Sequence, residues 1–253
     1  MRVLDEIYTA EDLARLYDHF NAWGASDEFY LDLALKAGGP VLDLGCGTGM
    51  LACRIAAEGL TVVGVEPSRS MLAIARARPG AELVDWVRSG AESLRLAQRF
   101  DLVCMTGHAF QALLTDEHAL AVLKTARLHL ARGGRFAFET RNQAARAWLA
   151  WTPASACRLV HAQGQGRIEE TVEAVHEATS GIVFLRHRYR FLDQGIEREG
   201  ASRIRFVDQA HLARLIAEAG LAPVTLYGDW NGTSWTSQSQ EIIAVTEAAW
   251  SDS

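Results

Sequence analysis

The sequence predicts an α/β protein with a doubly wound, seven-stranded, mostly parallel sheet and a small antiparallel β insertion. Short apolar runs alternate with helical patterns before residue 144 and after residue 206, as in buried parallel strands joined by helices. A glycine-rich turn follows the first apolar run, and residues 144–206 interrupt the rhythm with alternating apolar and charged side chains. We therefore expect one domain formed by residues 1–143 and 207–253, and an inserted antiparallel subdomain at residues 144–206.

Composition and charge narrow the classes of protein to consider. The chain has 253 residues, 49% of them hydrophobic and 22% charged, which fits one large globular domain or a domain with an insertion. A formal net charge of −6 without a basic run argues against a nucleic-acid partner. Because the sequence has neither an apolar run of about 20 residues nor a signal-peptide core, we expect a cytoplasmic protein without a membrane partner. The cysteines lack metal-ligand spacing, which predicts reduced thiols and no metal site: Cys46, Cys53, Cys104 and Cys157.

Two helices are expected before the first strand. Residues Glu11–Phe20 and Asp27–Lys36 carry apolar side chains at helical spacing, and a turn containing Trp23 separates them. Tyr17 and Trp23 either pack these helices on the core or line a ligand cleft, and the residues alone leave both readings open.

The stretch Pro40–Met50 carries the clearest functional signal. Val41–Leu44 predicts a buried strand, a helical pattern runs through Thr48–Gly59, and the turn between them reads G-C-G-T-G. Such a turn admits a ligand close to the main chain, because glycine adopts positive φ and the helix start offers free N–H groups. The dinucleotide fingerprint G-x-G-x-x-G would need a glycine at Met50, so a dehydrogenase is the least favoured class.

An acidic residue ends the second predicted strand. Glu66 follows the apolar run Val62–Val65, at the strand end where a carboxylate can accept hydrogen bonds from both hydroxyls of a ribose. Together, V-L-D-L-G-C-G-T-G and V-V-G-V-E-P resemble motif I and the acidic second-strand end of class I S-adenosylmethionine-dependent methyltransferases. The resemblance covers roughly residues 38–140 and returns more weakly near the C-terminus.

This resemblance implies a Rossmann-like methyltransferase fold with S-adenosylmethionine as the cofactor. In the family, N-terminal helices often cap the cofactor and substrate cleft, which makes Tyr17 and Trp23 substrate-binding candidates. Where the family commonly has an Asp-Ala pair beside the adenine, this chain has Gly90 and Ala91, so we expect the contact to the adenine amine from Glu92 or Ser89. The cofactor-binding candidates are Asp43, Gly45, Cys46, Gly47, Gly49, Glu66, Pro67, Met71, Gly90, Ala91, Glu92, Thr106 and Gly107.

The later elements of the domain continue the α/β pattern. Pro67 leads into a helix that Ser68 or Ser70 caps, with Met71 on its apolar stripe. Further strands are expected at Leu83–Val87, Phe100–Met105 and Arg135–Thr140, with a helix beginning at Thr115 before the third of them. After the insertion, a helix over Asp208–Gly220 precedes strands at Pro223–Tyr227 and Gln240–Thr246.

Residues after the fourth strand are the candidates for the acceptor side, because ligands bind at the carboxyl ends of such strands. Thr106 and Gly107 suit close approach of the cofactor. His108 is a candidate general base, since an imidazole exchanges a proton near neutral pH, but lining the pocket or packing the loop are alternatives. Phe110 and Gln111 resemble family residues beside the methionine moiety or the substrate.

Arg141 follows the fifth strand at the same sheet edge. A guanidinium there suits a substrate carboxylate or phosphate. A salt bridge to a nearby acid such as Glu139 is the competing role, and the sequence favours it slightly.

Residues 144–206 predict a short tryptophan-rich helix at Ala144–Trp151 and strands near 156–163, 167–176, 181–192 and 196–206. In the third strand, Val183, Leu185, His187, Tyr189 and Phe191 share one face. Arg186, Arg188 and Arg190 share the other. We expect this arginine row to form ion pairs with glutamates of neighbouring strands, with binding of an anionic substrate as the alternative.

The function implied by the resemblance is methyl transfer from S-adenosylmethionine to a small-molecule acceptor by in-line displacement. The cofactor brings the activated methyl group, so the protein mainly aligns donor and acceptor and excludes water. The alternatives are a non-catalytic protein that binds S-adenosylmethionine or S-adenosylhomocysteine, and a transferase with a related cofactor. The acceptor atom is unspecified, the insertion and N-terminal helices are expected to select the acceptor, and a homodimer is left open.

Overall fold

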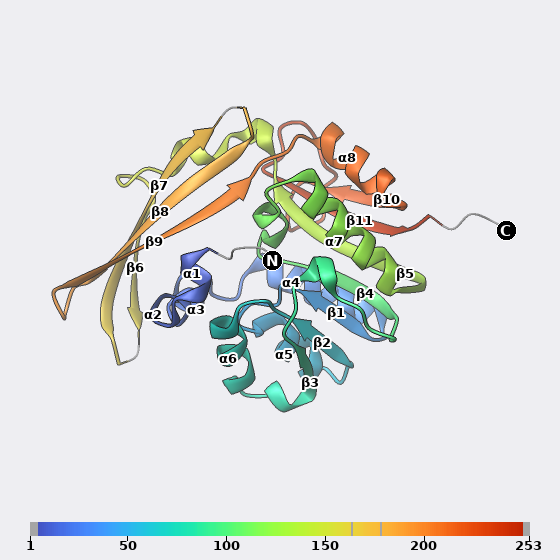
Figure 1. Cartoon of the computed structure of the whole chain (residues 1–253), viewed down its shortest axis with the longest axis horizontal. Coiled ribbons are helices and arrows are strands. Elements are labelled where there is room, and N and C mark those ends of the chain that lie inside the picture. The colour runs from blue at the N-terminus through green and yellow to red at the C-terminus, as the bar shows by residue number, and fades with distance from the viewer. Residues whose placement is uncertain (1–4, 163, 178, 250–253) are drawn as a thin grey trace.

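A seven-stranded sheet in the order β10-β11-β5-β4-β1-β2-β3 forms the centre of the computed structural model, which describes residues 5–249 except 163 and 178 (Figure 1). The strand β11 is antiparallel to both of its neighbours, and the other pairings are parallel. The predicted mostly parallel sheet is therefore confirmed. Its strands are β1 (Val41–Leu44), β2 (Val62–Val65), β3 (Val84–Val87), β4 (Phe100–Met105), β5 (Leu130–Arg141), β10 (Leu221–Tyr227) and β11 (Glu241–Ala248).

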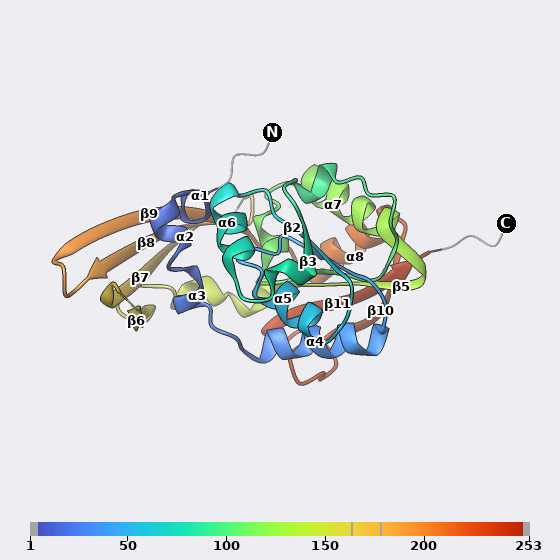
Figure 2. The same ribbon diagram turned by 90° about the horizontal axis from the view of Figure 1, so that it is seen from below.

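Helices cover both faces of this sheet because alternate strand residues point to opposite sides. Leu42 and Val103 belong to the core under α7 and α8, whereas Val41 and Leu102 belong to the core under α4 and α5. Figure 2 shows α7 on one side of the sheet and α4 on the other. The helices are α4 (Ala25–Ala37), α5 (Met50–Ala57), α6 (Arg69–Ala77), α7 (Asp116–His129) and α8 (Gln209–Glu218).

Two of the predicted helix starts are confirmed by their caps. Ser68, rather than Ser70, caps α6, because its hydroxyl accepts the N–H of Met71 at 3.3 Å. Thr115 caps α7 by accepting the N–H of His118 at 3.2 Å. No helix among the described residues combines the length and the apolar composition that a membrane span requires.

The insertion forms a second sheet, antiparallel throughout, in the order β6-β7-β8-β9. Its arginine row is ion-paired as predicted, since Arg188 lies 3.2 Å from Glu199 and Arg190 lies 2.9 Å from Glu169. The predicted end of its first strand at residue 163 lies outside the described residues, and the division into two domains stays a prediction. The strands are β6 (Cys157–Ala162), β7 (Gly166–Glu177), β8 (Ile182–Phe191) and β9 (Ile196–Arg205).

Three short N-terminal helices lie between the second sheet and α6 (Figure 1). Leu13, Leu16 and Phe20 pack against Tyr189 and Phe191 on the apolar face of the second sheet. The single helix predicted over Glu11–Phe20 is wrong, because the Leu16 N–H bonds to the carbonyl three residues back and tightens the turn there. The helices are α1 (Glu6–Thr9), α2 (Glu11–Ala14) and α3 (Tyr17–Phe20).

Short 3₁₀ turns replace a helix in the segment that leaves β5. The predicted helix at Ala144–Trp151 is wrong: η4 and η5 stand there, separated by Arg146 in the left-handed conformation at φ 47°. A non-glycine residue at positive φ cannot continue a right-handed helix, so the segment bends at this point. The 3₁₀ turns are η1 (Ala81–Leu83), η2 (Ala91–Ser93), η3 (Ala109–Ala112), η4 (Gln143–Ala145) and η5 (Ala147–Ala150).

Candidate active site

The glycine turn after β1 is built as the sequence predicts. Gly45, Gly47 and Gly49 have φ of 75°, 56° and 76°, the left-handed region that glycine adopts without steric cost. The amides of Gly45 and Cys46 donate to the carbonyl of Val65 at 2.8 and 3.1 Å, which fixes the turn to the end of β2.

Two of these glycines are needed for different reasons. A Cβ on Gly49 would lie 2.5 Å from the ring of Trp86, so this glycine permits close packing of α5 on β3. A Cβ on Gly47 would lie 3.7 Å from Cε of Met71, which is ordinary contact. A side chain at this position would therefore be strained only by the positive φ. Met71 thereby lies beside the turn, as expected of a cofactor-site candidate.

The carboxylate of Glu66 connects β2 to the glycine turn. It is 7% exposed and accepts the N–H of Ser68 at 2.7 Å and of Gly47 at 3.1 Å. A carboxylate oxygen can accept more than one hydrogen bond, so these two contacts are compatible with a ligand hydroxyl at the same carboxylate. Pro67 follows directly and turns the chain toward α6.

At the end of β3, the side chain of Glu92 folds back over Gly90. A Cβ on residue 90 would lie 2.5 Å from Oε1 of Glu92, so this carboxylate stands where a side chain of residue 90 would begin. Ala91, buried at the start of η2, lies between the two. A carboxylate therefore lies beside position 90, and it belongs to Glu92, one of the two residues expected to replace the acid of the family motif.

Asp43 is buried under the turn and faces Cys104 across β1 and β4. It is 1% exposed, and the Cys104 thiol donates to its Oδ1 at 3.8 Å. Burial raises the pKa of Asp43 to about 7. Burial also raises the pKa of the thiols of Cys46 and Cys104, so both are neutral.

The residues after β4 place one imidazole between two carboxylates. Gly107 and His108 both adopt positive φ, and the His108 N–H donates to Oε1 of Glu139 at 2.6 Å. The Nε2 atom of His108 lies 3.0 Å from Oε2 of Glu241, which begins β11. Because a carboxylate faces Nε2, we assign the ring proton to Nε2, which leaves the lone pair on Nδ1 as the acceptor. Thr106 closes the turn by accepting the Ala109 N–H.

One aromatic ring lies beside this imidazole and another beside its partner Glu139, on the α4 side of the sheet. The Tyr30 hydroxyl donates to Oε2 of Glu139, and the indole of Trp230 lies edge-on to His108 with 6.5 Å between ring centroids. Burial raises the pKa of both Tyr30 and Glu139. This part of the site is therefore acidic and aromatic.

Tyr17 extends the aromatic wall over the end of β4. Its hydroxyl lies 3.5 Å from the position that a Cβ on Gly107 would take, and its ring lies 6.3 Å from that of Tyr8. Burial, reinforced by Tyr8, Asp18 and Glu66, raises the pKa of Tyr17, so its hydroxyl stays protonated. The structure thus brings Tyr17 to the same sheet edge as Glu66 and His108.

A cluster that the sequence did not reveal ties α3 to the glycine turn. Asp18 accepts the hydroxyl of Thr48 at 2.6 Å and forms an ion pair with Arg78, whose Nε donates to the Thr48 carbonyl at 3.0 Å. The hydroxyls of Ser68 and Ser70 donate to the carbonyls of Tyr8 and Thr9 in the first of the N-terminal helices. The N-terminal helices are therefore anchored to the loops on which the site is built.

Arg141 and Gln111 contact each other rather than an acid. Nη1 of Arg141 donates to Oε1 of Gln111 at 2.8 Å, and the guanidinium lies over the ring of Trp151 at 5.2 Å. The predicted salt bridge from Arg141 to Glu139 is wrong, since the guanidinium bonds to Gln111 of η3 instead. Gln111 in turn donates to the carbonyl of Arg205, which links the sheet edge to the insertion.

Two substrate-binding candidates lie away from this edge. The indole N–H of Trp23 donates to Glu28 on α4 at 2.6 Å, and its ring packs on the core under that helix. Phe110 is 4% exposed and packs on Phe138 inside the core under α7. Hydrophobic periodicity cannot distinguish a core aromatic such as Trp23 from a pocket aromatic such as Tyr17, and Phe110 was a candidate only by its resemblance to family residues.

This chain is similar to known methyltransferases in sequence and in structure. The profile of the methyltransferase domain family matches residues 41–134. Cypemycin N-terminal methyltransferase from Streptomyces sp. is 28% identical over 216 residues, covering 83% of this chain and 83% of that protein. The structure of the CcbJ methyltransferase from Streptomyces caelestis is similar, with a TM-score of 0.75 and 25% identity over 96% of this chain and 99% of that one. The S-adenosylmethionine-bound structure of CalS10, an amino pentose methyltransferase from Micromonospora echinaspora, has the same fold, with a TM-score of 0.67 and 20% identity over 98% and 99% of the two chains.

Proposed function

We propose, from the premise that this chain is a class I S-adenosylmethionine-dependent methyltransferase, that it methylates the nitrogen of a small-molecule amine. The observation that carries the proposal is the His108–Glu241 pair, because a carboxylate facing Nε2 favours the tautomer whose Nδ1 can accept a proton at the sheet edge. The names of two similar proteins agree with an amine acceptor, since one methylates an N-terminus and another an amino pentose.

The described residues fit the cofactor. Gly47 keeps the main chain open beside Met71, the carboxylate of Glu66 is an acceptor of the kind that suits ribose hydroxyls, and the carboxylate of Glu92 stands where an adenine amine is expected. Tyr17 offers an aromatic ring and a protonated hydroxyl near Gly107, where a sulfonium would gain from the ring. When bound, the cofactor supplies an activated methyl group. The proposed binding set remains the one given by the sequence, with Glu92 filling the role of the absent acid at position 90.

The acceptor side suits a cationic amine. An alkylamine is protonated at neutral pH and must lose a proton before it can attack a methyl group. The carboxylates of Glu139 and Glu241 and the rings of Trp230 and Tyr17 favour a cation in this part of the site. In this proposal, Nδ1 of His108 takes the proton from the ammonium, which frees the nitrogen lone pair.

Glu241 has two tasks during that proton transfer. By accepting the Nε2–H, it keeps His108 in the tautomer that has Nδ1 free, and its charge stabilises the imidazolium that forms. General-base catalysis of this kind contributes typically about 10²–10⁴-fold to the rate. The anchored N-terminal helices and the second sheet shield the reacting groups from water. Arg141 and Gln111, joined to each other and to the insertion, are proposed to contact the rest of the acceptor.

A panel of matched small molecules tests this assignment. Primary and secondary amines, the corresponding alcohols and the corresponding carboxylates are incubated with the protein and S-adenosylmethionine, and methylated products are identified by mass spectrometry. We expect methylation of amines alone. Transfer to oxygen would overturn the amine assignment. Tight binding of S-adenosylhomocysteine without turnover of any amine in the panel would favour the non-catalytic binding protein instead.

A further inference from the structure

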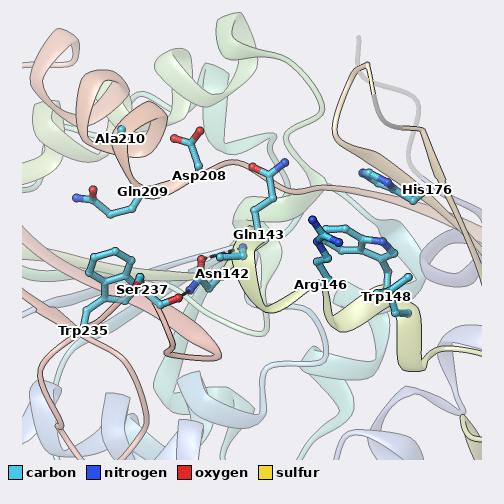
Figure 3. A pocket seen from close by; sticks show the side chains of 12 residues that line it. Asn142, Gln143, Arg146, Trp148, His176, Asp208, Gln209, Ala210, Trp235 and Ser237 are labelled. Carbon is cyan, nitrogen blue, oxygen red and sulfur yellow. Dashed lines mark hydrogen bonds between the residues drawn. The ribbon is translucent and has the colours of Figure 1, made fainter.

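A cavity of about 650 Å³ lies on the α8 side of the main sheet (Figure 3). Its walls come from the segment after β5, from β7, from the start of α8 and from the loop between β10 and β11. Trp235 in this loop packs on the core under α7 and α8, whereas Trp230, which faces His108, packs on the core under α4. Trp235 and Trp230 therefore lie on opposite faces of the sheet, and the cavity shares no lining residue with the candidate active site.

Two ring nitrogens at this cavity are buried without a partner. These are Nε1 of Trp235 and Nε2 of His176. Buried polar atoms in native proteins are nearly always hydrogen-bonded, so each such atom requires an explanation. In addition, no hydrogen bond or ion pair joins the side chains of Gln143, Arg146 and Gln209 to other residues in the described ranges. Several polar groups that make no hydrogen bond to other described residues thus line one cavity.

The frame of the cavity is already formed. Asn142 uses its whole amide within the protein, since Nδ2 donates to the carbonyls of Ser237 and Ser239 and Oδ1 accepts the Ala144 N–H. The indole of Trp148 is stacked on His176, with 4.4 Å between ring centroids, and meets Phe206 edge-on. These contacts hold two walls in place before a ligand arrives, as in most small-molecule sites.

The backbone at Arg146 is strained in a way that serves the cavity. A non-glycine residue at positive φ is strained and persists only where its surroundings impose this conformation. Here the left-handed turn between η4 and η5 brings the Arg146 side chain beside Trp148 at the cavity wall (Figure 3). Strain of this kind is often retained at ligand-binding positions.

The lining indicates the class of ligand. The lining carries one positive charge, on Arg146, and one negative charge, on Asp208. Because these charges balance, the cavity suits an uncharged molecule. Amide, guanidinium and carboxylate groups each carry two adjacent polar atoms, a spacing that matches neighbouring hydroxyls on a ring. The indoles offer apolar surface to the ring itself. A peptide could not add to a strand here, because β5 and β7 are each paired on both sides.

From these observations we infer that the cavity is a second ligand-binding site, separate from the methyl-transfer site, and that it takes an uncharged glycosyl ring. The ring lies against the indoles, while its hydroxyls accept from Trp235 and Arg146 and bond with Gln143, Gln209 and Asp208.

Calorimetric titration with methyl β-D-glucopyranoside and with methyl β-D-xylopyranoside tests the inference on the full chain saturated with S-adenosylhomocysteine. We expect saturable binding of at least one of the two in the millimolar range. Trp235→Phe removes the indole N–H, and Gln143→Ala removes an amide that no described contact uses, so each should weaken binding about fivefold, the effect of one lost hydrogen bond. Gln238→Ala, in the same loop but outside the cavity, serves as the matched control and should bind like the parent protein.

Absence of saturable binding with both glycosides would overturn the inference. Equal affinity in the parent protein, Trp235→Phe and Gln143→Ala would do the same, once thermal melting shows that both variants are folded. Preferential binding of the uncharged peptide N-acetyl-glycyl-glycinamide would reassign the cavity to peptide ligands. None of these measurements uses methyl transfer, so the result stands apart from the proposed function.

Discussion

The backbone N–H of His108 donates to Oε1 of Glu139 at 2.6 Å, while its ring meets Glu241 at 3.0 Å. Two glutamates on neighbouring strands, β5 and β11, thereby hold one histidine by its main chain and by its side chain. The first contact helps to keep His108 at a φ of 57°, and the second sets the ring tautomer.

Replacing His108 by asparagine should lower kcat for an amine acceptor by about 10²–10⁴-fold, because the variant cannot accept the proton. Asparagine tolerates the left-handed conformation and keeps the backbone N–H for Glu139, so the loop should be preserved. The measurement is steady-state kinetics, together with the affinity for S-adenosylhomocysteine, which should not change. Glu241→Gln should also lower kcat, by a smaller factor, because a carboxamide does not stabilise an imidazolium.

His161→Asn, which changes an exposed histidine on β6, is the control for that pair of variants and should leave kcat unchanged. A change confined to KM in His108→Asn would show that the imidazole positions the acceptor. An unchanged kcat and KM with a confirmed acceptor would remove His108 from the site.

Changes at Gly47 and Glu66 should weaken S-adenosylhomocysteine binding. Gly47→Val places a β-branched residue at a φ of 56° in the turn and should abolish binding while the protein stays folded. Glu66→Gln removes the charge that accepts from the turn and, in the proposed cofactor site, from the ribose, and should cost about 1.5–3 kcal/mol of binding free energy. Calorimetry measures both, and Glu82→Gln, an exposed change in η1, is the control. Parent-like affinity in both variants would contradict the proposed cofactor site.

Asp18→Asn should speed the release of S-adenosylhomocysteine. The variant loses the ion pair with Arg78, which is partly shielded from solvent, and weakens the bond to Thr48. Since these contacts hold α3 on the glycine turn, we expect about a fivefold to twentyfold faster dissociation, equivalent to about 1–2 kcal/mol. Stopped-flow displacement gives the rate. Asp12→Asn, in α2, breaks an exposed ion pair with Arg198 of β9 and should have little effect. Equal dissociation rates in the parent and Asp18→Asn would show that the cluster does not hold the site closed.

Asp43 should make the free energy of unfolding depend on pH. Burial raises its pKa to about 7, so the folded state keeps a proton that the unfolded state loses near pH 4. This group therefore lowers the stability of the folded protein progressively as pH rises from about 4 to about 7, by up to about 4 kcal/mol. Asp43→Asn should remove this decline, and its stability relative to the parent should rise over that range and then level off.

Denaturant unfolding at several pH values checks this expectation. Asp85→Asn, at an exposed position on β3, should follow the parent at every pH. A constant difference between Asp43→Asn and the parent from pH 4 to pH 8 would mean that Asp43 is ionised throughout.

Sequence reasoning succeeded where the determinant is local. The glycine turn needs positive φ within five consecutive residues, and the apolar runs on either side of it specify buried strands, so the turn at Gly47 and the position of Glu66 directly after β2 could be predicted from spacing. The ion-paired arginine row was predictable for the same reason, because alternation within one strand puts Arg186, Arg188 and Arg190 on one face.

The acceptor side depends on long-range register and could not be predicted in this way. Glu241 reaches His108 only because β11 pairs with β5 so that Glu241 lies opposite Arg141. Tyr30 reads as one more apolar position of α4, and nothing near Asp18 in the sequence indicates Thr48 or Arg78. Predicting such contacts would require knowing which strands and helices become neighbours in the fold.

The position of β11 has a consequence for how the protein becomes active during synthesis. The strand follows all the other described strands along the chain, yet it is inserted between β5 and β10. A nascent chain that has released residues up to Arg141 already contains the glycine turn, Glu66 and His108, but not the carboxylate 100 positions further on that orients the imidazole. If His108 acts as proposed, a growing or truncated chain can hold the nucleotide before it can deprotonate an amine. Catalysis would then depend on insertion of the final strand, so that only a chain with a completed sheet is active.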